Sequence, residues 1–370
     1  MMKKILKFNQ EPDYPLLAVI FILVVFGLII LASASSSIAK EKFDDSFYYL
    51  KRQILYGFLP GFFGFLFGYF FNYKNYKKIS LLLLIINIFL LILVKFSPLG
   101  LNFGGSSRWL RLGPIVFQPS ELLKITYIFY VAAWLSNVRA NRTGDLFKGF
   151  LPFIVVSGLI GFLLYIQPAT SIIMIVLGSG ALLYLIGGAR LKYFSLIFFV
   201  GMIGIGILYF FGSGYRFQRI QSFLNPNEDI YGGAYHLNQA LITVGSGGLT
   251  GFGFGKSTTK AKTLPEPLGD SIFAVSSQEL GFIGSSFLVL TLAFLVIRLF
   301  WLAIKYKERF GQLILCGFGL IIGIQSIIHI AVLIGFFPPT GIPLPFVSYG
   351  GTSLAVLMTM SGIALNITRN

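Results

Sequence analysis

Apolar runs of roughly 20 residues, enough to span a bilayer as an α-helix, recur along the whole chain between short polar, turn-forming segments. Such runs are too long for the strands of a membrane barrel, and an open sheet would leave backbone groups unpaired in hydrocarbon. The pattern therefore predicts an all-α polytopic membrane protein. Its ten predicted helices lie at 16–34, 53–71, 79–94, 121–138, 150–166, 170–187, 193–211, 271–299, 311–336 and 351–367.

The connection 212–270, between the seventh and eighth predicted helices, is much longer than the others. No fixed-period repeat or low-complexity tract divides the chain, so residues 1–370 are predicted to form one membrane domain. The first apolar run follows a basic start and ends in Ala32-Ser33-Ala34, as a cleaved signal peptide would. Because this run is long enough to span, and Glu11, Asp13 and a proline interrupt the leader, we expect an uncleaved first helix.

The composition supports the membrane class, with 56% hydrophobic and 11% charged residues. A typical soluble domain has about a quarter of its residues charged. The net charge of +16 comes from 29 basic residues against 13 acidic ones. These basic residues form no single basic face, which argues against nucleic acid and favours topology signals and anionic lipid headgroups. The one cysteine, Cys316, lies in an apolar run, so there is no intramolecular disulfide.

Lysine and arginine are enriched on alternate connections, the asymmetry that sets membrane orientation. Two connections on the other side, 167–169 and 337–350, contain no basic residue. We therefore predict that the enriched side and both termini are cytoplasmic, and that the long connection faces outward from the cytoplasmic (inner) membrane. The basic residues on the enriched side are Lys74, Lys77, Lys78, Arg139, Arg142, Lys148, Arg190, Lys192, Arg298, Lys305, Lys307, Arg309 and Arg369.

Asp270 lies where the longest polar connection gives way to the helix predicted at 271–299. A carboxylate at this place is typical of an N-cap or first-turn residue, because free backbone N–H groups and the helix dipole stabilise it. The alternative is a general base at the membrane surface, since ionisable groups at membrane depth are costly and usually functional. Position alone favours the cap and leaves the base open.

The connection before the fourth predicted helix is richer in polar and turn residues than a tether requires, and it carries Arg108 and Arg111. Ser120 has the position of an N-cap, with Glu121 in the first turn. Lys124 follows three residues later on the same helix face. It forms either an intrahelical ion pair with Glu121 or a cation facing a polar cavity, because a lysine facing lipid at that depth would be costly.

The long connection contains polar residues and then a glycine-rich segment, 245–257. The residues of interest in it are Arg216, Arg219, His236, Asn238, Gln239, Ser246 and Lys256. Gly255-Lys256-Ser257 suggests a P-loop, but that motif needs a glycine where this chain has Thr250. The repeated glycines suit close backbone approach, and their amides with Lys256 could still bind a phosphate. His236 is predicted to be structural or solvated, and two distant histidines with one cysteine make no metal site.

The connection 337–350 contains four prolines and no charge. Irregular backbone at membrane depth persists only where it is buried in protein or lines a cavity. We therefore predict a re-entrant or cavity-wall element, with Ser348 and Tyr349 among its polar groups. His329, in the apolar run before it, is predicted to form an interhelical hydrogen bond.

Six motifs spread over nearly the whole chain form a specific set. They are Arg108-Trp109, Gln118-Pro119-Ser120-Glu121 with Lys124, Gly245-Ser246-Gly247-Gly248-Leu249, Asp270-Ser271-Ile272-Phe273-Ala274, Glu279-Leu280-Gly281, and the most specific, Thr340-Gly341-Ile342-Pro343-Leu344-Pro345-Phe346-Val347-Ser348-Tyr349-Gly350-Gly351. Together they resemble the SEDS family, the shape, elongation, division and sporulation proteins (FtsW, RodA and SpoVE) of bacterial cell-wall synthesis. Ser33-Ala34-Ser35 and the segment 46–53 are more similar to the division branch, FtsW, or its sporulation relative than to RodA.

The chain departs from the family pattern at three places. It has Glu266-Pro-Leu-Gly-Asp270 where the family usually has Glu-x-His-Thr-Asp, and Gln278-Glu279 where a Glu-Glu pair is usual. Ala169 follows Gln167-Pro168 where an Asp is expected. These departures concern the fine tuning of the site, and they leave the family's key Asp in place at Asp270.

The resemblance implies a peptidoglycan glycosyltransferase that polymerises lipid II at the outer face of the membrane during cell division. Asp270 would be the general base that takes the proton of the acceptor sugar's 4-hydroxyl, whose oxygen displaces the lipid diphosphate with inversion. The cations expected to steady that diphosphate are Arg108, Arg111, Lys124, Arg216, Arg219 and Lys256. The other predicted substrate-binding residues are Glu121, Gln239, Ser246, Ser348 and Tyr349.

The implied partners are the growing glycan strand, a class B penicillin-binding protein transpeptidase, other divisome proteins and membrane lipid. No organic cofactor is implied, while a divalent cation, Mg²⁺ or Mn²⁺, bridging the diphosphate stays open. Two other functions stay open as well. A lipid II flippase is disfavoured because the polar motifs gather on one side and no inverted repeat or pair of broken helices is evident. A scaffold for division proteins would not need Asp270 or Lys124.

Overall fold

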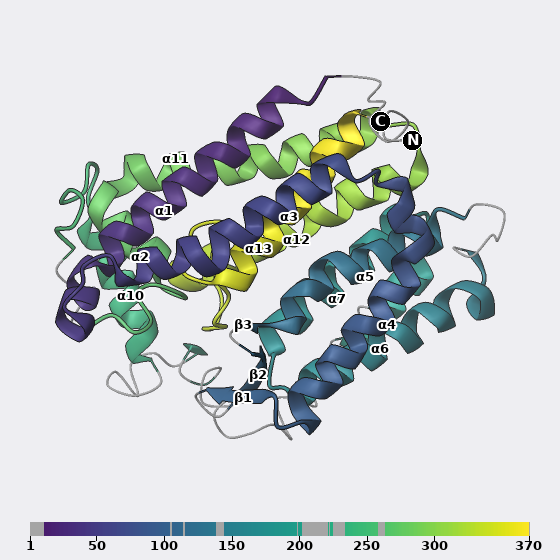
Figure 1. Cartoon of the computed structure of the whole chain (residues 1–370), viewed down its shortest axis with the longest axis horizontal. Helices are drawn as coiled ribbons and strands as arrows, with labels where there is room; N and C mark the ends of the chain where they lie inside the picture. Colours follow the sequence, from purple (N-terminus) through teal and green to yellow (C-terminus); the bar gives the residue numbers. More distant parts are fainter. Residues whose placement is uncertain are drawn as a thin grey trace.

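The computed structural model describes residues 11–103, 106–113, 115–137, 144–197, 199–201, 221, 223–224, 234–257 and 263–369. Long helices lying side by side make up most of this part of the chain (Figure 1). They are α1 (Tyr14–Phe43), α2 (Tyr48–Gln53), α3 (Leu59–Phe70), α4 (Lys74–Phe96), α5 (Pro119–Leu135), α6 (Leu151–Ile166), α7 (Thr170–Ile186), α10 (Tyr235–Ser246), α11 (Ile272–Lys305), α12 (Arg309–Leu333) and α13 (Gly351–Arg369). Two π-helical segments, η2 (Ile54–Phe58) and η5 (Leu146–Phe150), lead into α3 and α6.

Within the described residues, seven helical stretches are long and apolar enough to cross a bilayer. They are Tyr14–Phe43, Tyr48–Phe70, Lys74–Phe96, Leu146–Ile166, Ile272–Lys305, Arg309–Leu333 and Gly351–Arg369. Two helices of 17 residues, α5 and α7, lie where two further spans are predicted. The prediction of an all-α polytopic membrane protein is confirmed. Of its ten helices, the one predicted at 193–211 falls mostly outside the described residues.

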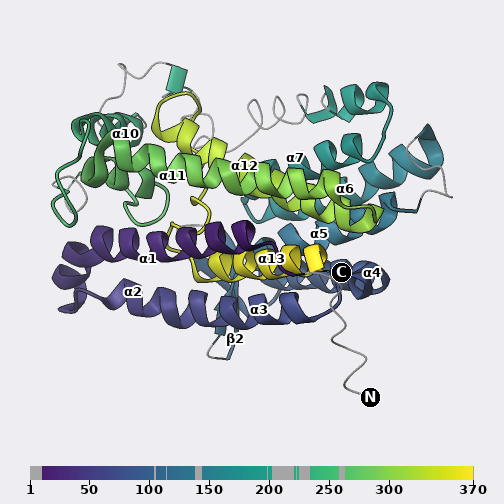
Figure 2. The same ribbon diagram turned by 90° about the horizontal axis from the view of Figure 1, so that it is seen from above.

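The helices form two layers, which Figure 2 shows from above. One layer contains α1, α2, α3 and α13, and the other contains α10, α11 and α12. The layers are joined because α1 packs on α11, while α12 packs against α5 and α7 as well as α11. Helices α12 and α13 are mostly buried, whereas α3 and α4 are mostly exposed along their apolar stretches. The exposed apolar helices are the surfaces that the bundle offers to lipid.

Glycines allow α3 and α13 to approach each other closely. Gly57, Gly61, Gly64 and Gly68 are spaced three or four residues apart, so they share one helix face. A Cβ on Gly68 would lie 2.9 Å from the backbone nitrogen of Ile363 in α13. Small residues at this spacing let membrane helices gain van der Waals contact, which drives their association when lipid is as apolar as the side chains.

A small antiparallel sheet lies in the connection between α4 and α5, where no strand was predicted. Its strands β1 (Gly100–Phe103), β2 (Ser106–Leu112) and β3 (Ile115–Phe117) are paired in the order β1-β2-β3. The sheet lies at the end of α4 that is remote from the C-terminus (Figure 1). We call this end of the bundle, with β1–β3 and the connections that follow α6, α10 and α12, the sheet end.

Candidate active site

Asp270 lies in a turn at the sheet end, directly before the residue that caps α11. Helix α11 begins at Ile272 with Ser271 as its N-cap, so the prediction that Asp270 is an N-cap or first-turn residue is wrong. Ser271 Oγ donates to the carbonyl oxygen of Pro265 at 2.7 Å and therefore accepts from Nε2 of His236 at 2.8 Å. These bonds fix the turn, and Asp270 is partly exposed beside them.

The connection 337–350 is irregular backbone, partly buried over 337–341 and mostly buried over 342–348. It packs on α1 so closely that a Cβ on Gly27 would overlap the carbonyl group of Phe346. Gly341 has a φ of +70°, a conformation that favours glycine. A Cβ on Gly341 would lie 3.1 Å from Oδ2 of Asp270. The carboxylate predicted to be the base and the predicted cavity wall are therefore in direct contact.

Ser348 and Tyr349 attach this connection to the turn before α11. Ser348 Oγ donates to the carbonyl oxygen of Gly269 at 2.7 Å and accepts from the backbone nitrogen of Leu344 at 2.8 Å. The backbone nitrogen of Tyr349 donates to the carbonyl oxygen of Leu268 at 2.8 Å. Both predicted substrate-binding residues thus have a clear role in holding the site together.

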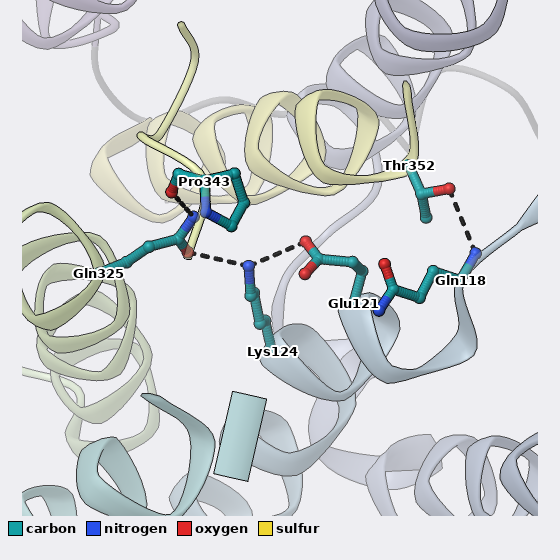
Figure 3. Close-up of polar contacts among 6 residues, drawn as sticks. All are labelled: Gln118, Glu121, Lys124, Gln325, Pro343 and Thr352. Atoms are coloured by element: carbon teal, nitrogen blue, oxygen red, sulfur yellow. Dashed lines mark hydrogen bonds and ion pairs between the residues drawn. The ribbon is translucent and has the colours of Figure 1, made fainter. Parts of the chain in front are cut away.

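Lys124 lies in the interior between α5 and α12 (Figure 3). Its Nζ donates to Glu121 Oε2 at 2.8 Å and to Gln325 Oε1 at 2.8 Å. The side chains of Lys124 and Glu121 are 0% and 4% exposed. The ion-pair interpretation is confirmed, and the expectation that Lys124 faces a polar cavity is wrong.

The burial of Lys124 and Glu121 separates them from any bound substrate. Desolvating two charges is compensated only by good geometry and further hydrogen bonds, which Gln325 supplies here. A nearby bond also visible in Figure 3, from the backbone nitrogen of Gln118 to Thr352 Oγ1 at 3.2 Å, attaches the start of α5 to α13. The contacts of the pair shown in Figure 3 are therefore with protein groups of α5 and α12.

Two polar residues of α12 make contacts that were not predicted. Gln325 Nε2 donates to the carbonyl oxygen of Pro343 at 2.8 Å. His329 Nδ1 lies 2.5 Å from the carbonyl oxygen of Ile342. An interhelical hydrogen bond had been predicted for His329, but this partner belongs to the connection 337–350. The sequence did contain a sign of these contacts: two polar residues lie one helical turn apart in an apolar run, and such residues are costly in a membrane unless they have partners.

Arg108, in β2, ties the sheet to the connection that follows α6. Its guanidinium donates to the carbonyl oxygen of Gln167 at 3.4 Å and to that of Pro168. The hydroxyl of Ser171, at the start of α7, donates to the carbonyl oxygen of Thr340. A series of contacts therefore runs from the sheet through residues 167–171 to Thr340, which directly precedes Gly341.

The other predicted substrate-binding residues are exposed, partly exposed or outside the described residues. Arg111 and Lys256 are exposed at the sheet end, where they are accessible to a ligand. Arg216 and Arg219 lie outside the described residues. Gln239 lies partly exposed on α10. Among the described residues, no group of three or more His, Cys, Asp or Glu side chains is arranged to hold a metal ion.

The glycine-rich segment supplies hydrogen-bond partners where α11 is broken at Gly281. Gly281 has φ 66° and ψ −166°, so the backbone groups around it lack helical partners. Backbone groups of 248–253 supply those partners: the nitrogens of Phe252 and Gly253 donate to the carbonyl oxygens of Gln278 and Glu279, and the nitrogens of Phe282 and Ile283 donate to those of Gly248 and Leu249. Glycine is needed because a Cβ on Gly251 would overlap the backbone of Glu279.

These bonds argue against the predicted phosphate cradle. The amides of Phe252 and Gly253 are committed to α11, and that of Gly255 donates to Ser33 Oγ in α1 at 2.7 Å. Ser246 Oγ accepts from Gln278 Nε2 at 2.8 Å, so this predicted substrate-binding residue also holds the break together. Two of its glycines, Gly247 and Gly251, lie where two backbones meet.

Comparison with known proteins gives relatives along nearly the whole chain. Stage V sporulation protein E of Bacillus subtilis is 36% identical over 362 residues, which cover 98% of this chain and 98% of that protein. A protein of Geobacter sulfurreducens named probable peptidoglycan glycosyltransferase FtsW is 36% identical over 362 residues, covering 97% and 95%.

Solved structures share the fold. The rod shape determining protein RodA of Thermus thermophilus matches with a TM-score of 0.69 at 25% identity, covering 97% of each chain. A chain from a structure of a peptidoglycan synthase complex matches with a TM-score of 0.80 at 23% identity, covering 97% of this chain and 98% of that one. The family model of FtsW, RodA and SpoVE, described as "Cell cycle protein", matches residues 14–370. The chain therefore belongs to the FtsW/RodA/SpoVE family, the SEDS family that its motifs resemble.

Proposed function

We propose that this protein is a peptidoglycan glycosyltransferase that polymerises lipid II into glycan strands during cell division, with Asp270 as its general base. Relatives named probable peptidoglycan glycosyltransferase FtsW support the activity. The division role is supported by the number of FtsW relatives, although SpoVE is equally similar.

The observation that carries the proposal is the contact between Asp270 and Gly341. A partly exposed carboxylate lies there beside the partly buried backbone of Gly341 at the sheet end. An acceptor hydroxyl bonded to this carboxylate would pass its proton to Oδ while its oxygen attacks the donor's anomeric carbon. The bond from that carbon to the diphosphate oxygen breaks, and the diphosphate leaves with the electron pair. A positioned base contributes about 10²–10⁴ in rate.

The exposed cations at the sheet end complete the proposed chemistry. Arg111 and Lys256 are accessible there and would stabilise the charge of the departing diphosphate. Arg216 and Arg219 are proposed to join them. Lys124 is assigned a different role, because a buried and paired ammonium cannot approach a phosphate.

The test is Asp270→Asn, assayed as purified protein with lipid II. We expect polymer formation to fall by about 10²–10⁴ while the thermal unfolding midpoint stays unchanged. Asp45→Asn is the matched control, because it removes a carboxylate that is also partly exposed, in the turn between α1 and α2. Near-normal glycan product from Asp270→Asn would refute the base role.

We also propose that both termini are cytoplasmic. The basic residues of the end opposite the sheet end support this orientation, including Lys74, Arg190 and Lys305. A single cysteine introduced at Lys148 or at Arg111, in a Cys316→Ser background, should report the side by its reaction with an impermeant thiol reagent. Labelling of position 148 from outside intact cells would contradict the orientation.

The proposed partner is a class B penicillin-binding protein. Polymerisation with and without that transpeptidase would show whether the partner raises the rate. A divalent cation is proposed only as a counterion of the diphosphate, so EDTA should lower the rate by weakening substrate binding.

Lipid II transport is the second candidate, and the break in α11 favours it. Broken helices form the binding sites of many transporters by offering free backbone groups to the substrate. At Gly281, however, the freed groups are bonded to residues 248–253, so they cannot take part in substrate binding as they stand. Translocation of labelled lipid II in liposomes without polymer formation would favour the transporter.

A further inference from the structure

One face of α12 carries two buried polar side chains, Gln325 and His329, which are 0% and 2% exposed. They are one helical turn apart, and both contact backbone carbonyls of the connection 337–350. Gln325 Nε2 lies 2.8 Å from the oxygen of Pro343, and His329 Nδ1 lies 2.5 Å from that of Ile342. We call this arrangement the carbonyl clamp.

The clamp fixes the protonation of His329. A carbonyl oxygen only accepts a hydrogen bond, so Nδ1 carries the proton in the bond to Ile342. In a neutral ring Nε2 is then the unprotonated nitrogen, and among the described residues it has no hydrogen-bond partner. The structure therefore assigns one tautomer to this residue.

Lys124 fixes the orientation of the Gln325 amide. An ammonium group only donates, so the Gln325 oxygen must face Lys124 at 2.8 Å, and this leaves the NH₂ group to face Pro343 (Figure 3). Glu121 balances the charge of Lys124 inside the protein. The buried pair thus determines which end of the amide reaches the connection.

The two clamped carbonyls directly follow Gly341, the residue that contacts Asp270. Its φ of +70° and the 3.1 Å separation between a Cβ built on it and Asp270 Oδ2 leave little space between backbone and carboxylate. We propose that Gln325 and His329 are positioning residues that hold the turn 341–343 against Asp270, with Lys124 acting through Gln325. The catalytic consequence rests on the proposed function. Displacing a reacting group by about 1 Å can cost about 100-fold in rate.

The first test does not depend on activity. The chain has two histidines, so ¹⁵N-histidine labelling of the full-length protein gives two sets of ring signals, and His329→Asn identifies which set belongs to His329. We expect His329 to be protonated on Nδ1 alone. Protonation on Nε2 would overturn the clamp, because Nδ1 could then not donate to Ile342.

The second test measures glycan synthesis. Gln325→Leu and His329→Leu keep side-chain volume but remove the donors, and we expect kcat to fall about 10- to 100-fold with KM for lipid II little changed. His329→Asn retains a donor near the place of Nδ1 and should recover most of kcat. Amide exchange in 337–350 should quicken in both Leu variants and stay near wild type in His329→Asn.

The control is Gly64→Ala in the contact between α3 and α13, where a Cβ would overlap Thr359 Oγ1. It should lower the unfolding temperature without lowering kcat of the folded protein. Unchanged kcat in the Leu variants, or an equal loss in Gly64→Ala at matched stability, would overturn the positioning role. If the wild-type protein makes no glycan, the proposed function fails, and the tautomer and exchange measurements still decide on the clamp.

Discussion

Two stretches of non-helical backbone at the sheet end have their backbone groups hydrogen-bonded in different ways. At one the partners are other backbone groups, which we call the backbone repair, and at the other they include side chains, which we call the side-chain repair. At Gly281 in α11, the freed groups pair with backbone groups of 248–253. In the connection 337–350, several backbone groups pair with side chains of other elements, while the backbone nitrogen of Tyr349 pairs with the carbonyl oxygen of Leu268. Those side chains are Gln53, Ser171, Gln325 and His329.

The two kinds of pairing differ in how easily a substitution can change the position of the backbone. Backbone pairing needs glycine where two main chains meet, and it leaves no side chain that could change the spacing. Side-chain pairing can be altered one residue at a time, because each buried donor or acceptor sets one contact. The connection repaired by side chains is the one that contacts Asp270. Placement of the proposed base is therefore set by replaceable side chains.

The largest expected effect comes from Gly251→Ala, which tests the backbone repair. Gly251 and Gly255 both have a φ of +76°, but nothing lies within 4 Å of a Cβ on Gly255. Gly255→Ala should therefore cost only the left-handed conformation, about 1–2 kcal/mol. Gly251→Ala adds overlap with the backbone of Glu279, and we expect a loss above roughly 4 kcal/mol or no folded protein. Equal unfolding temperatures in detergent for the two variants would contradict this account.

Lys124→Met should have the next largest effect, because it removes the charged group that holds Gln325, a side chain of the side-chain repair. It leaves Glu121 buried without a counter-charge, which costs about 3–5 kcal/mol. The double variant Glu121→Gln/Lys124→Met removes both charges and should regain most of that stability. Thermal unfolding of the two single variants and the double variant gives the coupling, and additive losses would mean that the pair is not coupled.

The sequence was sufficient to predict the long apolar helices of the described residues, because each one depends on a local apolar run. It did not predict α10, which lies within the predicted connection 212–270. It did not indicate the sheet, whose strands of three to seven residues lie in a polar connection. The role of 248–253 was also hidden. A glycine-rich segment suits a phosphate cradle as well as a backbone contact, and only the position of Gly281 opposite it decides between them.

The site was predicted in parts but not as a whole. Asp270 and the motif 340–351 were found by their family pattern, yet the contact between Asp270 and Gly341 depends on how two connections fold together. Lys124 was left open between an ion pair with Glu121 and a polar cavity, and its second partner, Gln325, lies 201 residues away in the chain. A single sequence does not contain such pairings.

Gln53→Leu should have a smaller effect on the side-chain repair. Gln53 Oε1 accepts from the backbone nitrogen of Gly350 at 3.0 Å, and the side chain is buried. Its removal leaves the N–H of Gly350 without this acceptor and also removes the long hydrogen bond, 3.5 Å, from Gln53 Nε2 to the carbonyl oxygen of Ser348. We expect a cost of about 1–3 kcal/mol. Denaturation in detergent measures this loss. If Gln53→Leu loses as much stability as Lys124→Met, the buried charge is not the reason for the larger effect expected at Lys124.

The smallest effect is expected at Asp45, a partly exposed carboxylate that accepts hydrogen bonds in the turn between α1 and α2. A hydrogen bond from Lys51 and a second from the backbone nitrogen of Phe47 hold the pKa of Asp45 below its usual value of 3.8. Because the folded-state pKa is lowered, the carboxylate stabilises the fold above the unfolded-state value, and this contribution is lost as pH falls through the folded value. Asp45→Asn should therefore lower the unfolding temperature slightly at about pH 7, and the difference should shrink toward about pH 3. Water can replace both hydrogen-bond partners here, so little stability should be lost. If Asp45→Asn loses as much stability as Gln53→Leu, burial is not the reason that the side-chain hydrogen bonds of the connection 337–350 stabilise the fold.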